Sequence, residues 1–254
     1  MSLVGSRIFI TNDDGINAPG LKVLEEIAKN FSKDVWVVAP ETEQSATGHS
    51  LTITSPLRVR KTGRQKFAIS GTPTDSVLLG IKHIITGKVP DIILSGINAG
   101  ANLGDDVTYS GTVAAAMEGV LLGIPSIALS QSRVYGKNVR WTAAKKYAPS
   151  ILKKLGSEGW ARNVFMNVNF PDLSPGEVSR VEITVQGRRK IGETIVKGRD
   201  PRGDDFVWIG TERNEDISYK GSDLNAISEG RISITPLGLD LTHRNSMKRL
   251  NELF

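Results

Sequence analysis

Two adjacent aspartates directly follow a short apolar segment near the start of the chain. Residues 7–11 read Arg-Ile-Phe-Ile-Thr, and Asn12-Asp13-Asp14-Gly15 come next. Neighbouring carboxylates repel each other unless a cation lies between them, and Mg²⁺, Mn²⁺ and Ca²⁺ prefer such hard oxygen ligands. The alternative is an ordinary Asp-Gly turn on the surface. The pair is therefore a candidate metal site in which Asp13 and Asp14 are the ligands.

A glycine- and asparagine-rich loop leads into a helix pattern further along the chain. Residues 95–106 read Ser-Gly-Ile-Asn-Ala-Gly-Ala-Asn-Leu-Gly-Asp-Asp, and the predicted helix begins at Ser110. A helix N-terminus presents free backbone N–H groups and the positive end of its dipole, which favour a bound phosphate. A plain N-cap behind a tight loop is the alternative. The candidate phosphate contacts are Asn98, Gly100, Asn102, Ser110, Gly111 and Thr112.

Two other polar segments follow strand patterns, and each alone is explained without a function. Residues 40–49 contain Ser45 and Thr47, either of which offers a neutral oxygen ligand, but an exposed loop accounts better for the segment when it is considered alone. Residues 71–75 are explained by helix capping at Thr72, with a proline at the first helical position.

The segments between these loops predict a mostly parallel sheet covered by helices on both faces. Short apolar runs alternate with stretches of helical periodicity, which is typical of βαβ units. We therefore predict a three-layer α/β/α, Rossmann-like fold. In such sheets ligands bind beyond the carboxyl ends of the strands, where the polar loops described above lie. Strands are expected at 7–11, 34–39, 51–60, 67–70, 91–94, 124–129, 164–169 and 231–235, and helices at 21–28, 74–86, 110–122, 141–155 and 241–254.

The pattern changes after about residue 180. Residues 191–197 and 205–209 are strand-like on either side of a turn at 200–203, which predicts a projecting C-terminal β-hairpin. An isolated hairpin is marginally stable in water, so we expect it to pack on a partner. The predicted organisation is an α/β core that carries the candidate metal and phosphate sites, residues 1–185 plus 230–254, and a hairpin or oligomerisation arm, residues 186–229.

Composition limits the compartment and the classes of partner. The 254 residues include no cysteine, which excludes disulfides, zinc–thiolate sites and cysteine nucleophiles and favours a reducing, cytoplasmic setting. No apolar run is long enough to span a bilayer, and the first residues lack a secretion signal. The net charge of +5 favours anionic partners. No aromatic-interleaved motif accompanies the basic residues, so no specific nucleic-acid binding is predicted.

A metal beside a phosphate site indicates phosphoryl chemistry, because a metal polarises phosphoryl oxygens and lowers the pKa of a bound water. We predict a metal-dependent phosphatase that uses a metal-bound water as nucleophile. A phosphatase with an aspartyl-phosphate intermediate is one alternative. Such enzymes usually have two aspartates separated by one residue, and here Gly15 stands where the second aspartate would be, which disfavours that mechanism. A non-catalytic nucleotide- or phosphate-binding regulator is the alternative from a different class. His49 is a candidate for assisting protonation.

These residues resemble the SurE family, the stationary-phase survival proteins, which are nucleoside-monophosphate phosphatases. The resemblance is dense and ordered through the N-terminal half, whereas the C-terminal third matches mainly in layout. One departure is Gln44, where the family commonly has arginine, and it would weaken a nearby positive charge. The motifs are Asn12-Asp13-Asp14-Gly15, Val38-Ala39-Pro40, Gln44-Ser45-Ala46, Gly71-Thr72-Pro73-Thr74-Asp75, Ser95-Gly96-Ile97-Asn98-Ala99-Gly100, Asn102-Leu103-Gly104-Asp105-Asp106 and Tyr109-Ser110-Gly111-Thr112.

The resemblance implies a specific site and reaction. One divalent metal per subunit, Mg²⁺ or Mn²⁺ with Ca²⁺ able to occupy the site, would be held by Asp13, Asp14, Ser45 and Asn98. Asp13, Asp14 and Asn98 would be the catalytic residues, with the phosphate lying against Asn98 and the helix start at 110–112. The implied substrates are nucleoside 5′- and 3′-monophosphates and short-chain polyphosphate. The implied assembly is a homodimer or homotetramer with exchanged C-terminal elements and no membrane partner.

Overall fold

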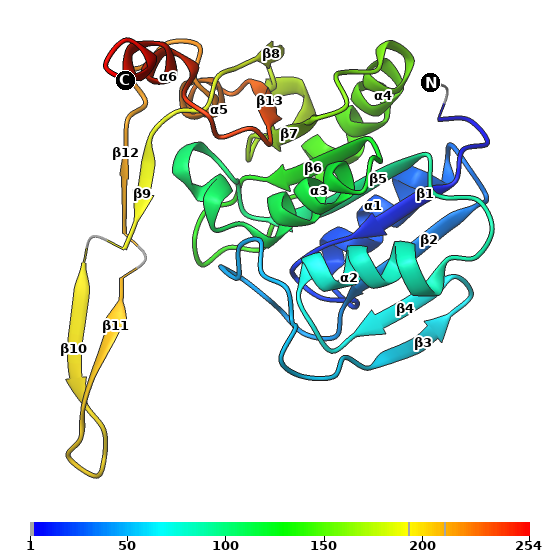
Figure 1. The fold of residues 1–254 in the computed structure, drawn as a ribbon, viewed down its shortest axis with the longest axis horizontal. Helices are drawn as coiled ribbons and strands as arrows, with labels where there is room; N and C mark the ends of the chain where they lie inside the picture. The colour runs from blue at the N-terminus through cyan, green and yellow to red at the C-terminus, as the bar shows by residue number, and fades with distance from the viewer. Residues whose placement is uncertain (1–2, 193, 211) are drawn as a thin grey trace.

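The computed structural model describes residues 3–192, 194–210 and 212–254, and its centre is a nine-stranded sheet (Figure 1). The strands from β4 to β7 in the sheet run parallel to one another, and the three remaining strands run the opposite way. The order across the sheet is β3 (Val59–Gly63), β4 (Lys66–Ile69), β2 (Val35–Pro40), β1 (Ile8–Thr11), β5 (Ile92–Ala99), β6 (Ser126–Gln131), β7 (Val164–Phe170), β13 (Ile232–Gly238) and β8 (Val181–Ile183).

Helices cover both faces of this sheet. On one face lie α1 (Pro19–Lys29) and α4 (Thr142–Glu158), and on the other α2 (Pro73–Leu79) and α3 (Gly111–Leu121). Side chains alternate between the faces along β1, because Ile8 and Ile10 pack with α1 and α4 whereas Phe9 packs toward α2 and α3. The predicted three-layer α/β fold with a mostly parallel sheet is therefore confirmed.

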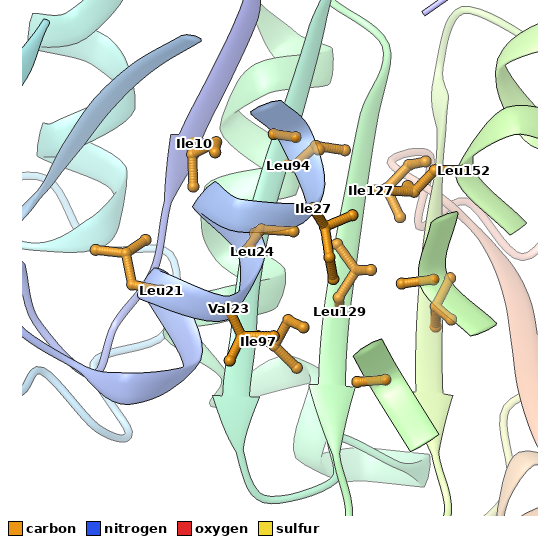
Figure 2. Packing of buried hydrophobic residues seen from close by; sticks show 14 of the residues in the cluster. Ile10, Leu21, Val23, Leu24, Ile27, Leu94, Ile97, Ile127, Leu129 and Leu152 are labelled. Atoms are coloured by element: carbon orange, nitrogen blue, oxygen red, sulfur yellow. The ribbon is translucent and has the colours of Figure 1, made fainter. Parts of the chain in front are cut away.

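The largest apolar cluster joins α1 to the strands beneath it. Figure 2 shows Leu21, Leu24 and Ile27 of α1 lying over side chains of β1, β5 and β6. Helix and strand approach closely at Gly20, where a Cβ atom would lie 1.9 Å from the carbonyl oxygen of Ile97. Glycine at this position therefore holds the start of α1 directly against the strand that carries Asn98.

Beyond β8 the chain leaves the sheet as a long arm and returns through α5 (Asp223–Ser228) into β13 (Figure 1). In the arm, β9 (Arg189–Ile191) pairs antiparallel with β12 (Arg213–Glu215), and β10 (Ile195–Arg199) pairs antiparallel with β11 (Asp205–Ile209). The predicted C-terminal hairpin is thus confirmed. Its side chains are open to solvent and include Val196, Val207, Trp208 and Ile209.

Several predicted element boundaries are wrong. Residues 51–58 lie outside any strand, and β3 begins only at Val59; Pro56 has no N–H to donate to a sheet. The helix predicted at 74–86 ends at Leu79 and continues as a π-helical turn, residues 80–84. There Gly80 lies against the ring of Phe9, where a Cβ atom would be 2.3 Å from a ring carbon.

The C-terminal region also differs from the expectation in detail. The terminal helix α6 (Arg244–Asn251) is shorter than the predicted 241–254, and neither β12 nor α5 was predicted. Throughout the described part of the chain, no helix combines the length and apolar character needed to cross a membrane.

Candidate functional site

The candidate site lies at the carboxyl edge of the sheet, where β1 and β5 end side by side. Thr11 pairs with Ser95 in the parallel register, and the two aspartates follow β1 directly. β1 lies between β2 on one side and β5 on the other, so this is where the strand order reverses. Open α/β sheets bind ligands at such a switch point.

Strand β5 extends further into this site than predicted. Residues 95–99 were expected to belong to a loop, but they form the last five residues of β5. The pairing of β5 with β6 is irregular between Ser95 and Asn98. The strand therefore delivers Asn98 to the same edge as the aspartates, with its position fixed by sheet hydrogen bonds.

Asp13 is buried against the first turn of α3. It is 5% exposed, and the hydroxyl of Thr112 donates a hydrogen bond to its Oδ1. A Cβ atom at Gly111 would lie 2.7 Å from the Cβ of Asp13 and 3.0 Å from the ring of Pro73. Glycine is therefore required at this position because it lets the helix start approach Asp13. The space that a side chain at Gly111 would need is filled by Asp13 and Pro73.

Burial raises the pKa of both aspartates. Burial, followed by the charge of Asp14, raises the pKa of Asp13 to about 7, against the lowering effect of the Thr112 hydroxyl and backbone N–H. Burial also raises the pKa of Asp14, although the Ala99 N–H donates to its Oδ2 at 3.1 Å and Arg133 acts in the same lowering direction. A buried carboxylate directly beside a half-buried one is an arrangement that a bound cation stabilises.

The residues that could complete a metal site are neutral oxygen donors. In the described part of the chain no cluster of three or more His, Asp or Glu side chains could hold a metal, so the two aspartates would need such partners. The side-chain N–H of Asn98 donates to the Gly100 carbonyl oxygen at 2.9 Å, which leaves its amide oxygen as the atom available to a cation. Two carboxylates with an amide oxygen fit Mg²⁺ or Mn²⁺.

Ser45 is the one predicted metal ligand whose side chain is exposed to solvent. Its hydroxyl donates to Oε1 of Glu43 at 2.7 Å. The loop around it is nevertheless attached to the site, because the N–H of Gln44 donates to the carbonyl oxygen of Asp13 at 2.8 Å. Because the Ser45 hydroxyl donates its proton to Glu43, the lone pairs of its oxygen are still available to a cation.

The same loop is joined to α3 on its far side. The N–H of Gly48 donates to the carbonyl oxygen of Tyr109 at 3.0 Å, and Nε2 of His49 lies 2.9 Å from Oε2 of Glu118. Glu118 is buried on α3. His49 therefore links the loop that carries Ser45 to the helix that begins at the site.

Asn102 is committed to the structure beneath the loop. Its backbone N–H donates to Oδ1 of Asn169, and its side-chain N–H donates to Oγ of Ser130, each at 2.8 Å. Its carbonyl oxygen accepts from the side chains of Asn167 and Asn169 at 2.9 and 3.1 Å. Asn102 was predicted to contact phosphate, and one N–H of its side-chain amide is used within the protein instead.

Comparison with known proteins decides the family. The family model described as "Survival protein SurE" matches residues 8–193. This chain belongs to the SurE family. It is 61% identical to "5′-nucleotidase SurE" of Paramagnetospirillum magneticum, covering 98% of this chain and 95% of that protein. The corresponding protein of Parvibaculum lavamentivorans is 55% identical, with 97% and 90% covered. The crystal structure of the SurE protein from Aquifex aeolicus aligns with a TM-score of 0.83 at 42% identity, covering 97% and 98% of the two chains.

Several supporting residues of this SurE chain were missed in the sequence, although some carried a signal. Glu118 is a single carboxylate in an apolar helical run, and Asn167 and Asn169 are two residues apart in a buried strand. Polar groups in such positions need hydrogen-bond partners. The pairing of Arg189 with Asp106, described below, had no comparable local signal.

Proposed function

We propose that this SurE chain is a metal-dependent 5′-nucleotidase that hydrolyses nucleoside monophosphates to nucleoside and phosphate. The observation that carries the proposal is the adjacent pair of buried Asp13 and half-buried Asp14, with Asp13 packed against the N-terminus of α3. The relatives named 5′-nucleotidase support the substrate class. One divalent ion, Mg²⁺ or Mn²⁺, would be held by Asp13, Asp14, the amide oxygen of Asn98 and the hydroxyl oxygen of Ser45. Ca²⁺ would fit the same donors.

When bound, the metal would polarise a phosphoryl oxygen and lower the pKa of a coordinated water. The protein supplies orientation and electrostatics. The N–H of Gly111 belongs to the first turn of α3 and has no acceptor within the helix, so it can hold a phosphate oxygen. Ser110 caps the helix, since its Oγ accepts from the Val113 N–H at 3.1 Å. Thr112 contributes chiefly by holding Asp13.

We assign the phosphate contacts to Asn98, Gly100, Ser110 and Gly111, and we assign Asn102 to support of the loop. Nucleoside 3′-monophosphates and short polyphosphate present the same terminal phosphoryl group to these residues. We include both as substrates in the proposal.

A metal-by-substrate panel tests the proposed reaction. Purified protein is treated with chelator, loaded with Mg²⁺, Mn²⁺ or Ca²⁺, and incubated with nucleoside 5′- and 3′-monophosphates while released phosphate is measured. We expect release with Mg²⁺ or Mn²⁺ and its loss on renewed chelation. Nucleotide binding without phosphate release under every metal would instead favour a phosphate-binding regulator.

We also propose that the arm, residues 186–229, joins copies of this chain into a homodimer or homotetramer in which C-terminal elements are exchanged, while residues 1–185 and 230–254 form the core. The exposed apolar side chains of β10 and β11 support this proposal, because a hairpin of two strands is marginally stable without a packing partner.

Light scattering on a size-exclusion column tests the assembly. The double substitution Val207→Asp and Ile209→Asp places two charges among exposed apolar residues of β11, and we expect the molecular mass in solution to fall. Arg202→Ala in the turn of the same arm is the matched control and should leave the mass unchanged. A double variant with the mass of the unmodified protein would contradict this role of the arm.

A further inference from the structure

One buried arginine attaches the root of the arm to the loop that precedes α3. Arg189 begins β9 and is 8% exposed. Its Nε donates to Oδ2 of Asp106 at 2.8 Å, and its Nη2 donates to the same oxygen and, at 3.0 Å, to the carbonyl oxygen of Ala101. Its backbone N–H donates to Asp105 at 3.0 Å, and its Nη1 donates to Glu215 of β12 at 3.1 Å. A single residue thus joins both inner strands of the arm to the loop.

The surrounding backbone fits the arm root closely against the loop. Gly104 has a φ of +54°, and a Cβ atom there would lie 2.9 Å from the backbone nitrogen of Arg189. The buried carboxylate of Asp223 accepts from the N–H groups of Gly104 and Gly187, each at 2.8 Å. Gln186 adds a bond from its side-chain N–H to the Gly104 carbonyl oxygen at 3.1 Å. The arm root and the loop are therefore one hydrogen-bonded unit.

Asp106 transmits this attachment to the helix start. Its carboxylate holds Arg189, whereas its carbonyl oxygen accepts from the backbone N–H groups of Tyr109 and Ser110, both at 3.0 Å. Ser110 is the N-cap of α3. The next residue, Gly111, is packed against Asp13. Only Asp106 thus separates the guanidinium group of Arg189 from the N-cap of the phosphate-binding helix.

We propose that Arg189 is a positioning residue that sets the N-terminus of α3 for phosphate binding through Asp106. This inference rests on the proposed function and deepens it. The planar guanidinium group reaches the Asp106 carboxylate and the Ala101 carbonyl oxygen together, which a single ammonium group does less well. Without Arg189, the buried carboxylate of Asp106 loses its main partner, and the bonded turn that orients Ser110 loses its support.

Through Arg189 and Asp106, the arm is connected with the proposed phosphate site at the start of α3. The strands β9 and β12 that lead to the tip of the arm are the strands that Arg189 and Glu215 join to the loop. Residues that orient metal ligands typically change metal affinity or activity by about 10- to 100-fold when they are removed, and we expect an effect of the same order from Arg189.

The test compares phosphate affinity in four proteins, each first checked for folding by circular dichroism. The competitive inhibition constant of inorganic phosphate and the KM of a nucleoside 5′-monophosphate are measured for the unmodified chain, Arg189→Met, Arg189→Lys and Arg199→Met. We expect both constants to rise at least about tenfold in Arg189→Met and less in Arg189→Lys. Arg199 forms an exposed ion pair with Asp205 within the arm, so its substitution is the matched control and should change neither constant.

Two further measurements keep the outcome decisive. Asp106→Asn preserves the size of the side chain and the backbone hydrogen bond to Ser110, and it should raise the same two constants. This variant provides the test if Arg189→Met does not fold. The Val207→Asp, Ile209→Asp variant shows how much is lost through weaker subunit association alone. A phosphate constant within twofold of the unmodified value in folded Arg189→Met, or an equal shift in Arg199→Met, would overturn the inference.

Failure of the proposed function would look different. In that case calorimetric binding of inorganic phosphate would still depend on Arg189, but no monophosphate would be hydrolysed by the unmodified chain. Hydrolysis that is indifferent to Arg189 would remove only the positioning role.

Discussion

Asp14→Asn is expected to lower the turnover of a nucleoside 5′-monophosphate by on the order of 10³-fold at saturating metal. The substitution removes one of two adjacent negative charges while preserving the size of the side chain. A metal contributes several kcal/mol of charge stabilisation in the transition state, and about 4 kcal/mol corresponds to three orders of magnitude in rate. The neutral amide oxygen can still accept from Ala99, so the turn after β1 should remain folded.

The measurement pairs phosphate release with calorimetric titration of Mn²⁺ into the chelator-treated protein. We expect weaker metal binding and slower release together. Asp240→Asn is the matched control, because Asp240 is paired with Arg244 near the C-terminus, outside the candidate site. If Asp14→Asn turned over nucleotide within about tenfold of the unmodified rate, Asp14 would not be a metal ligand.

The affinity for Mg²⁺ or Mn²⁺ is expected to rise about tenfold per pH unit up to about pH 7 and to level off above it. The cause is Asp13, whose pKa is raised to about 7 by burial and by Asp14. Below that pH the carboxyl carries a proton that the metal must displace, and above it no proton is released. Calorimetry in buffers of different ionisation enthalpy measures both the affinity and the number of protons released.

The same shift sets the pH dependence of stability in the metal-free protein. The folded pKa of Asp13 lies above its ordinary value of 3.8, so its contribution to stability is present below about pH 4 and is lost as pH rises toward 7. Urea unfolding between pH 5 and 8 should show this decline, and Asp13→Asn should lack it. The pKa of Asp14 and Asp223 is raised as well, so the difference between the two proteins isolates Asp13. For metal binding, an affinity for Mg²⁺ or Mn²⁺ that does not change between pH 5 and 7 would contradict the role of Asp13 as a metal ligand.

The architecture was predictable because its signals are local and repeated. The apolar runs before Asp13 and before Asn98 are buried strands, and the rule that ligands bind beyond strand ends places both residues at one edge. The capping pattern at Ser110 likewise predicts the start of α3 to within a residue. Strand boundaries were less predictable where tertiary pairing overrides local preference, as in residues 95–99, which the sheet holds as strand despite glycine and asparagine.

The residue types alone did not show which side chains in the site face a ligand and which support the surrounding structure. Asn102 and Asn98 are both asparagines in one loop-like segment, yet Asn102 is buried in a network with Ser130 and Asn169. Gly111 was predicted to permit the approach of an anion, and the structure adds that its missing side chain also makes room for Asp13. Arg189 and Asp106 are 83 residues apart, and no spacing rule relates positions so distant.

The place of β13 in the sheet has a consequence for how the chain is made. β13 pairs with β7 on one side and with β8 on the other, but the ribosome releases it only after the whole arm. Until then the outer edge of β7 has no partner, while the apolar strands of the arm are already exposed. Unpaired edges and apolar hairpins of this kind invite association between nascent chains. Truncation after β13 removes only α6 and leaves the sheet complete, whereas truncation before β13 opens β7 and leaves β8 without its neighbour in the sheet.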